Sequence, residues 1–400
     1  MPQKMKAVVK TRPQPGAEWL EVNVPELKPD WVMVKVRAAS ICGTDVHIYE
    51  WNSWAVDRIG SQKLPQILGH EVAGEVVEAG PHCKRIKAGD YISAETHIYD
   101  PGDLQTMLGQ FHIGERMKIV GVDHDGCFAE YFALPESVCW VNDKSIPPEL
   151  AAVQEPMGNA CYALLGENAD VAGKSAAIFG DGPTALFAAG LAKASGLTQI
   201  FVVGMSDFAL NIAKKMGADH TLNISDKSVN RLEFIRDQTG GYGADIVLDM
   251  VGAPAAIEEG MKVIRKGGRY SAFGVPPTTP VPVDYTNGIV FRGIQINGIS
   301  GRKMFDTWYR VKNFLASGRI DIKPIITHLF ELKDYAKGFE AAMGNPRQCG
   351  KAVLFPDPQE LAAAKNQFLA SWLTPGFVWA DNRSALRQQH HISTSSITIG

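Results

Sequence analysis

The chain has 400 residues, which is long enough for two domains with substantial hydrophobic cores. Hydrophobic residues make up 45% and charged residues 21%, a balance that is typical of globular proteins and argues against wholesale disorder. The net charge of −3 gives no basic field for nucleic acid or an anionic membrane, and the longest apolar runs are too short to cross a bilayer.

The N-terminal part of the chain, to about residue 155, is predicted to be rich in β-structure. It begins with MPQKMKAVVK, which has no apolar h-region, so we expect no secretory signal. Val32–Val36 alternates like a half-buried strand, and Val72–Val77 repeats this pattern. The six cysteines are widely spaced and form no CxxC pair, which favours a reduced, cytoplasmic chain over a disulfide scaffold.

From about residue 160, apolar runs alternate with helical segments. The expected elements are, in chain order, strand 175–179, helix 185–195, strand 200–203, helix 208–216, strand 244–249 and strand 268–273. This succession is typical of a doubly wound parallel sheet and of the α/β fold class. Beyond about residue 300 the pattern is mixed, with a last strand at 351–355 and a helix at 360–372.

A glycine-rich loop lies between the first of these strands and the helix that follows it. Its sequence, GDGPTA at 180–185, fits the G-x-G-x-x-G/A pattern. The first glycine permits the tight turn, the second lets a pyrophosphate approach the backbone, and the small last residue lets helix and strand pack closely. A glycine loop without a ligand is the alternative, but the flanking elements favour a dinucleotide site. We expect the cofactor to contact Gly180, Gly182, Pro183, Thr184, Gly204, Ser206, Gly274 and Val275.

The position that usually binds the adenosine ribose does not decide between NAD and NADP. About twenty residues after the loop, at the end of the second strand, an NAD enzyme usually carries Asp or Glu. Here that stretch is Val203-Gly204-Met205-Ser206, and the first acid is Asp207. The missing carboxylate removes repulsion toward a 2′-phosphate, but no arginine stands nearby to attract one.

A cysteine, a histidine and a glutamate that lie far apart in the chain form a candidate zinc site: Cys42, His70 and Glu155. Thiolate, imidazole and carboxylate are a plausible set of three catalytic ligands that leaves the fourth position to water or substrate. Zinc in such a site is a Lewis acid that lowers the pKa of a bound alcohol. Each residue alone is more often a structural one, but the three together with a nucleotide loop favour a metal site.

Longer stretches of the sequence resemble a known family, the zinc-containing medium-chain alcohol dehydrogenases. GHEVAGEVVEAG at 69–80 matches the zinc signature of that family, and the resemblance extends over about residues 5–356. Within the family the chain is similar to the L-threonine 3-dehydrogenase-like branch. The stretches that carry this similarity are CGTDVHIYEW (42–51), SAETHI (93–98), DGCFAEY (125–131), EPMGNA (155–160), GRKMFDTWY (301–309) and KPIITHLF (323–330).

The resemblance implies a fold of two domains. We expect a GroES-like, β-rich catalytic domain at 1–159 and a Rossmann dinucleotide-binding domain at 160–300. The chain would return to the catalytic domain at 301–356 and end in a tail at 357–400. Relatives associate through the edge of the nucleotide-binding sheet, so we expect a homodimer or homotetramer, with an edge strand within 288–299.

The resemblance also implies a role for each site residue. Cys42, His70 and Glu155 match the catalytic zinc ligands, while Glu71 matches the neighbouring acid that is either an exchangeable ligand or a support for one. Three further matches concern substrate and proton: Thr44 contacts the substrate alcohol, His47 passes the proton to solvent through the cofactor ribose, and His97 lines the substrate pocket. A hydroxyl can relay a proton without holding charge, and a histidine titrates near neutral pH.

The chain departs from the family at three places. Most relatives hold a second, structural zinc with four cysteines just after the segment that matches SAETHI, but residues 99–114 contain no cysteine. Asp100, Asp103 and His112 do not supply the four soft ligands of a structural zinc, so we expect one zinc per subunit. Asp181 puts an acid into the phosphate loop, and Gly204 and Ala209 replace the acid and the basic residue that the branch uses around the ribose.

Three functions remain open from the sequence, and each has a small-molecule ligand. The first is oxidation of the 3-hydroxyl of L-threonine to 2-amino-3-ketobutyrate with NAD or NADP. The second keeps this mechanism for a polyol or a bulkier or cyclic secondary alcohol, because the lobe and the ribose site have diverged. The third is a non-catalytic nucleotide-binding protein, and the intact set of zinc ligands argues against it.

Overall fold

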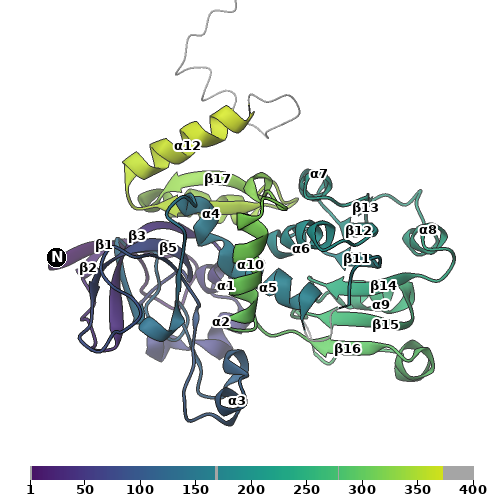
Figure 1. Cartoon of the computed structure of the whole chain (residues 1–400), viewed down its shortest axis with the longest axis horizontal. Helices are drawn as coiled ribbons and strands as arrows, with labels where there is room; N and C mark the ends of the chain where they lie inside the picture. Colours follow the sequence, from purple (N-terminus) through teal and green to yellow (C-terminus); the bar gives the residue numbers. More distant parts are fainter. Residues whose placement is uncertain (1, 167–169, 278, 373–400) are drawn as a thin grey trace, which may run out of the picture.

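The computed structural model describes residues 2–166, 170–277 and 279–372. Figure 1 shows two regions of β-sheet: strands of the N-terminal part on the left and a stack of later strands on the right, with helices between them. None of the helices within these described ranges has the length and apolarity needed to span a membrane.

A seven-stranded sheet forms the centre of the first region, in the order β10-β6-β5-β3-β18-β17, with β9 also paired to β3. Its long central strand, β3, is buried at nearly every position, because both of its faces are covered. β18 from the end of the chain pairs antiparallel with β3, so the C-terminal strands complete a sheet of N-terminal ones. The strands are β3 (Trp31–Ser40), β5 (Glu71–Ala79), β6 (Tyr91–Ala94), β9 (Tyr131–Pro135), β10 (Cys139–Val141), β17 (Ile326–Glu331) and β18 (Lys351–Phe355).

The second region is a parallel sheet of six strands in the order β13-β12-β11-β14-β15-β16. This is the 3-2-1-4-5-6 order of a dinucleotide-binding fold, in which the strand order reverses between β11 and β14. The strands are β11 (Ser175–Phe179), β12 (Gln199–Gly204), β13 (His220–Asn223), β14 (Ala244–Asp249), β15 (Ile264–Ala272) and β16 (Gln295–Gly298). The helices that belong to this sheet are α6 (Pro183–Ala194), α7 (Asp207–Lys215), α8 (Arg231–Gln238) and α9 (Pro254–Val263).

The remaining elements surround and connect the two sheets (Figure 1). Small sheets pair β2 with β1 and β4, and β7 with β8. Their strands are β1 (Lys4–Lys10), β2 (Glu18–Asn23), β4 (Gln66–Ile67), β7 (His97–Ile98) and β8 (Lys118–Ile119). The other helices are α1 (Gly43–Glu50), α2 (Ser53–Arg58), α3 (Leu104–Met107), α4 (Pro148–Ala152), α5 (Gln154–Leu165), α10 (Asp306–Ala316), α11 (Tyr335–Met343) and α12 (Pro358–Trp372).

Most of the predicted elements are confirmed. The strands predicted at 175–179, 244–249 and 351–355 have the bounds of β11, β14 and β18. The edge strand predicted within 288–299 is wrong for its first half, since Tyr285–Ile289 and Val290–Arg292 form helical turns and only β16 is extended. The predicted tail helix corresponds to α12, and the rest of the tail lies outside the described residues.

Candidate metal centre and active site

The end of β3 and the start of β5 bring three metal-ligating side chains together. Ser40, the last residue of β3, pairs with Glu71, the first residue of β5, so the residues next to this pair meet in space. One ligand atom from each of Cys42, His70 and Glu71 lies within 4.8 Å of the other two. His70 and Glu71 are buried, with 5% and 0% exposure, while Cys42 is partly exposed at the start of α1. A thiol, an imidazole and a carboxylate at this spacing fit a zinc ion.

Asp45 orients two members of this cluster. Its fully buried carboxylate accepts a hydrogen bond from the backbone N–H of Cys42 at 2.9 Å and lies 3.2 Å from His70 Nδ1. Burial alone would lower the pKa of His70, but the charges of Asp45 and then Cys42 raise it well above its usual value. A carboxylate on one imidazole nitrogen leaves the other nitrogen to a metal and makes it a stronger ligand. Asp45 was not among the residues predicted from the sequence, although its place three residues after Cys42 is that of a capping box.

Glu71 forms an ion pair with a buried lysine. Lys351 Nζ lies 2.6 Å from Glu71 Oε1, and the Ser40 hydroxyl donates to the other carboxylate oxygen. Burial raises the pKa of Glu71, Lys351 lowers it and the nearby Glu155 raises it again, with a net rise. Glu71 therefore lies among the candidate ligands, and Lys351 already balances the charge of its carboxylate.

Glu155 reaches the same region from the first turn of α5 and has one oxygen engaged and one free. Its Oε1 forms an ion pair with Arg302 at 2.6 Å and accepts from the Thr96 hydroxyl at 3.2 Å. Its Oε2 is buried and has no hydrogen-bond partner among the described residues. A buried carboxylate oxygen without a donor is costly unless a ligand satisfies it, so Glu155 fits the role of a metal ligand.

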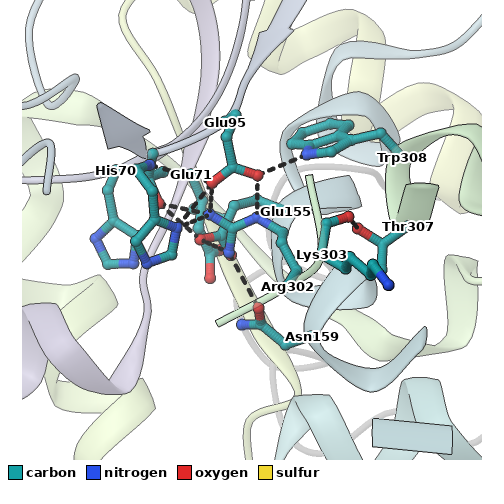
Figure 2. Close-up of polar contacts among 12 residues, drawn as sticks. His70, Glu71, Glu95, Glu155, Asn159, Arg302, Lys303, Thr307 and Trp308 are labelled. Carbon is teal, nitrogen blue, oxygen red and sulfur yellow. Dashed lines mark hydrogen bonds and ion pairs between the residues drawn. The ribbon is translucent and has the colours of Figure 1, made fainter. Parts of the chain in front are cut away.

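A network around Arg302 adjoins the metal ligands, and the sequence did not predict it. Figure 2 shows the Arg302 guanidinium between Glu95, Glu155 and Asn159, with the Trp308 indole beside Glu95. Arg302 Nε donates to Glu95 Oε2 at 2.7 Å, and the Trp308 indole N–H donates to the same oxygen at 2.8 Å. Although burial would raise the pKa of Glu95, Arg302 and then His97 lower it to about 2. Glu95 lies in the stretch SAETHI, and Arg302 and Trp308 lie in GRKMFDTWY. Both stretches carried the family resemblance, so the sequence held a signal for this network.

The three residues predicted to handle substrate and proton lie at different depths. His97 is buried in β7, and its Nδ1 lies 2.8 Å from Glu95 Oε1. Thr44 is in the first turn of α1, two residues after Cys42, and is partly exposed. His47 is exposed in the last turn of the same helix, with its Nδ1 2.7 Å from the side-chain amide of Asn52. The same helix therefore carries both predicted proton-handling groups, Thr44 near the metal cluster and His47 on its solvent-exposed side.

The predicted cofactor residues gather beyond the carboxyl ends of the parallel strands, where nucleotides bind in such folds. Gly180 follows β11 with φ of +125°, a conformation that favours glycine. A side-chain carbon added at Gly182 would meet nothing within 4 Å, so open space lies in front of the first turn of α6. Backbone N–H groups at a helix start that face open space fit a pyrophosphate.

The lobe at 99–116 is held by ion pairs. Arg116 Nε lies 2.9 Å from Asp103 Oδ1 and 3.1 Å from Asp100 Oδ2. His112 Nε2 lies 3.3 Å from the Tyr162 hydroxyl. Each of the three side chains considered as hard ligands therefore has a protein partner, and no second cluster of metal ligands is found among the described residues.

Comparison with known proteins assigns both halves of the chain to one class. Residues 28–144 match the alcohol dehydrogenase GroES-like domain, and residues 183–317 match the zinc-binding dehydrogenase domain. The chain is 48% identical to an L-threonine 3-dehydrogenase of Caldanaerobacter subterraneus subsp. tengcongensis over 353 residues, which cover 88% of this chain and 99% of the relative.

Two solved structures extend the comparison. The 2R,3R-butanediol dehydrogenase of Bacillus subtilis has a TM-score of 0.79 at 26% identity, over 88% of this chain and 100% of that one. A protein of Sinorhizobium meliloti 1021, described as a zinc-binding dehydrogenase and bound to NADP, has a TM-score of 0.78 at 25% identity, over 89% of this chain and 100% of that one.

Proposed function

This chain belongs to the zinc-containing medium-chain alcohol dehydrogenase family, and on that premise we propose that it oxidises the 3-hydroxyl group of L-threonine. The protein is an enzyme, an oxidoreductase with a GroES-like part and a Rossmann sheet that uses NAD or NADP. The proposed reaction converts L-threonine and NAD(P)⁺ into 2-amino-3-ketobutyrate, NAD(P)H and a proton. The observation that carries the proposal is the cluster of Cys42, His70 and Glu71, with the unpaired oxygen of Glu155 nearby, in a chain so similar to L-threonine 3-dehydrogenases.

In the proposed site, Cys42, His70 and Glu155 hold one zinc ion, and Glu71 is the neighbouring acid that can exchange with them. When bound, zinc supplies a Lewis acid that lowers the pKa of the substrate hydroxyl. Asp45 supports this set because it fixes the ring orientation of His70 through Nδ1. The burial of His70 and Glu71 strengthens the charge interactions of these two ligands.

The hydroxyl proton leaves the proposed site along α1. Thr44, next to the cluster, accepts the proton from the substrate and passes it on without holding a charge. The side chain of His47, one turn further along α1, is exposed and can release the proton to solvent. The contact with Asn52 orients its ring. His97 forms part of the substrate pocket, and Glu95 fixes its imidazole.

Substitution of Cys42 tests the function directly. Cys42→Ser removes the thiolate ligand, so we expect the zinc content to fall from one per subunit to near zero and turnover of L-threonine to be lost. Binding of the dinucleotide, measured by calorimetry, should be largely intact, because the cofactor residues lie on the other sheet. Cys83→Ser is the matched control, since Cys83 is a partly exposed thiol bonded to the Trp31 carbonyl outside the cluster. Unchanged turnover in Cys42→Ser would refute the proposed site.

A second candidate keeps the mechanism and changes the substrate. The fold is shared with a 2R,3R-butanediol dehydrogenase, and the lobe beside the active site carries ion pairs instead of cysteines. These observations favour a polyol or another secondary alcohol as the alternative substrate. Turnover with L-threonine beside a panel of secondary alcohols separates the two: the ratio of kcat/KM values should favour L-threonine, and a preference for a diol would support the alternative.

Three further properties belong to the proposal. We expect one catalytic zinc per subunit and no structural zinc, because the lobe has no cysteine. We expect a homodimer or homotetramer built through the edge of the parallel sheet at β16. We expect a cytoplasmic location, since the described cysteines are all free thiols.

A further inference from the structure

The carboxylate of Asp181 lies across the end of the neighbouring strand. Asp181 follows Gly180 in the loop between β11 and α6, and its Oδ2 accepts hydrogen bonds from the backbone N–H groups of Met205 and Ser206, both at 2.7 Å. These two residues come directly after β12. The acid in the phosphate loop is therefore bound to the loop that follows the second strand of the sheet.

Gly204 makes this arrangement possible. A side-chain carbon built on Gly204, the last residue of β12, would lie 2.6 Å from Asp181 Cβ and 2.8 Å from Asp181 Oδ2. Such distances are too short for real contacts, so a side chain at 204 and the carboxylate at 181 exclude each other. The Asp181 carboxylate thus occupies the place that the side chain of residue 204 would otherwise take.

In dinucleotide-binding folds, the side chain at the end of the second strand binds part of the cofactor. At the end of the second strand an acid accepts hydrogen bonds from the adenosine ribose hydroxyls of NAD. This chain has glycine there, but a carboxylate from the first loop stands in the same position. A carboxylate is therefore present at the usual position in the structure, although it comes from a different position in the sequence.

We propose that Asp181 binds the adenosine ribose and makes the enzyme selective for NAD over NADP. Its carboxylate can accept from a ribose hydroxyl, whereas it repels a 2′-phosphate. It also engages the two backbone N–H groups that would be available to a phosphate oxygen at this strand end.

Two polar side chains next to this position already have protein partners. The Ser206 hydroxyl donates to the Arg347 carbonyl, and a second carboxylate, Asp207, follows directly in the chain and accepts from Asn223. The inference rests on the proposed use of a nicotinamide dinucleotide and not on the identity of the alcohol.

Calorimetric titration of the zinc-loaded enzyme measures the selectivity without any turnover. The probes are NAD, NADP and two fragments that differ only by the 2′-phosphate, 5′-AMP and adenosine 2′,5′-bisphosphate. The wild type should bind NAD at least tenfold more tightly than NADP. In Asp181→Asn the ratio should fall by about tenfold or more, as expected for the loss of a charged hydrogen bond and of the repulsion, and the fragments should follow the same order.

Moving the carboxylate from position 181 to position 204 tests whether its location accounts for the selectivity. Asp181→Gly alone should lose the selectivity, and Asp181→Gly combined with Gly204→Asp should recover it, since the carboxylate then comes from its usual position. Gly204→Asp alone should lower the melting temperature, because it meets Asp181. Asp207→Asn is the matched control for a nearby acid and should change the ratio by less than about twofold.

The possible outcomes are separable. A wild type that binds NADP as tightly as NAD, or an Asp181→Asn variant that keeps the wild-type ratio, would overturn the role of Asp181. A wild type that binds neither dinucleotide would overturn the proposed function as well. A normal melting temperature of Asp181→Asn excludes loss of the fold as the cause of a changed ratio.

Discussion

Three carboxylates buried around the metal centre, those of Glu71, Glu95 and Glu155, are held by cations from distant parts of the chain. Lys351 from β18 binds Glu71, while Arg302, which precedes α10, binds both Glu95 and Glu155. Charges so deeply buried must be paired, because an uncompensated one costs several kcal/mol (about 3–5). These two cations balance the charge of the three carboxylates and fix their orientation.

Lys351 gives the first prediction. Lys351→Met leaves Glu71 buried without its cation, so the free energy of unfolding should fall by about 3–5 kcal/mol. The double variant Lys351→Met/Glu71→Gln should recover more than half of this loss, because no unpaired charge remains. Urea titration of the zinc-free proteins measures both values, with the exposed Lys87→Met as the control. Equal stability of the single and double variants would contradict the pairing.

Glu95 gives a prediction about pH. Its pKa falls from 4.5 to about 2 in the folded protein, which corresponds to about 3 kcal/mol of stability above the unfolded pKa. Because the folded value is the lower one, this contribution is complete above about pH 4.5 and is lost as the pH falls toward 2. Glu95→Gln removes it at every pH, so the gap in unfolding free energy between wild type and variant should shrink from pH 6 to pH 3. Glu50→Gln, an exposed control, should leave the pH profile unchanged, and a constant gap for Glu95→Gln would show that its charge is not involved.

The sequence could predict single residues where a motif fixed their type and spacing. Cys42 and His70 stand in such motifs, and the structure brings them together with Glu71. Arg302 and Lys351 are charged residues without any periodic pattern, and their partners lie hundreds of positions away, so only the tertiary fold identifies them. Asp181 was noted as an unusual acid, but the local sequence could not show that its side chain turns toward the next strand end.

At the scale of elements, the lobe at 99–116 gives a prediction about how an irregular segment is held without metal. Asp103 is its centre: its side chain is only 5% exposed, and its Oδ2 accepts from the Arg116 backbone N–H at 2.9 Å. Asp103→Ala should therefore speed amide hydrogen exchange of the lobe by about tenfold or more, as expected for a lost buried acceptor. Asp100→Ala is the matched control, because the side chain of Asp100 is 39% exposed and its pair with Arg116 contributes little.

Treatment with a chelator tests whether the lobe at 99–116 is held by ion pairs or by a bound metal ion. Removal of the zinc should leave hydrogen exchange of 99–116 unchanged, since the lobe is held by Asp103 and Arg116. Elemental analysis of the untreated enzyme should give one zinc per subunit. A lobe that loses protection with the chelator, or a count of two, would contradict this account.

Element prediction from the sequence succeeded for the buried strands and failed at the exposed edge. The strands β11, β14 and β18 are short apolar runs between turn signals, so their limits follow from the pattern. The apolar run at 288–292 resembled a strand, but Asp284 caps a helical turn through the Asn287 N–H, and Gly293 adopts a left-handed φ of +57° that ends it. Apolar content alone does not distinguish a strand from a short helix at an exposed sheet edge.

At the scale of the whole molecule, that surface determines the expected assembly. β16 is the last strand of the parallel sheet and pairs only with β15 among the described strands. Large apolar side chains are exposed on it or just before it in the chain, with Ile296 at 44% and Phe291 at 70%. An open strand edge and an apolar patch in one place are features that proteins normally cover, and a second copy can do so across a two-fold axis.

Phe291→Asp tests this assembly. A charge in the centre of an apolar contact must be desolvated when the copies associate, so we expect the variant to sediment as a monomer at concentrations where the wild type is a dimer or tetramer. Val56→Asp is the matched control, because Val56 is 49% exposed but lies in α2 of the N-terminal region, and it should leave the sedimentation coefficient unchanged. The dinucleotide affinity of the monomer should stay near that of the wild type, since the cofactor residues lie at the carboxyl ends of the strands and not along the outer strand edge. A variant that still sediments with the wild type would place the interface on another face of the molecule.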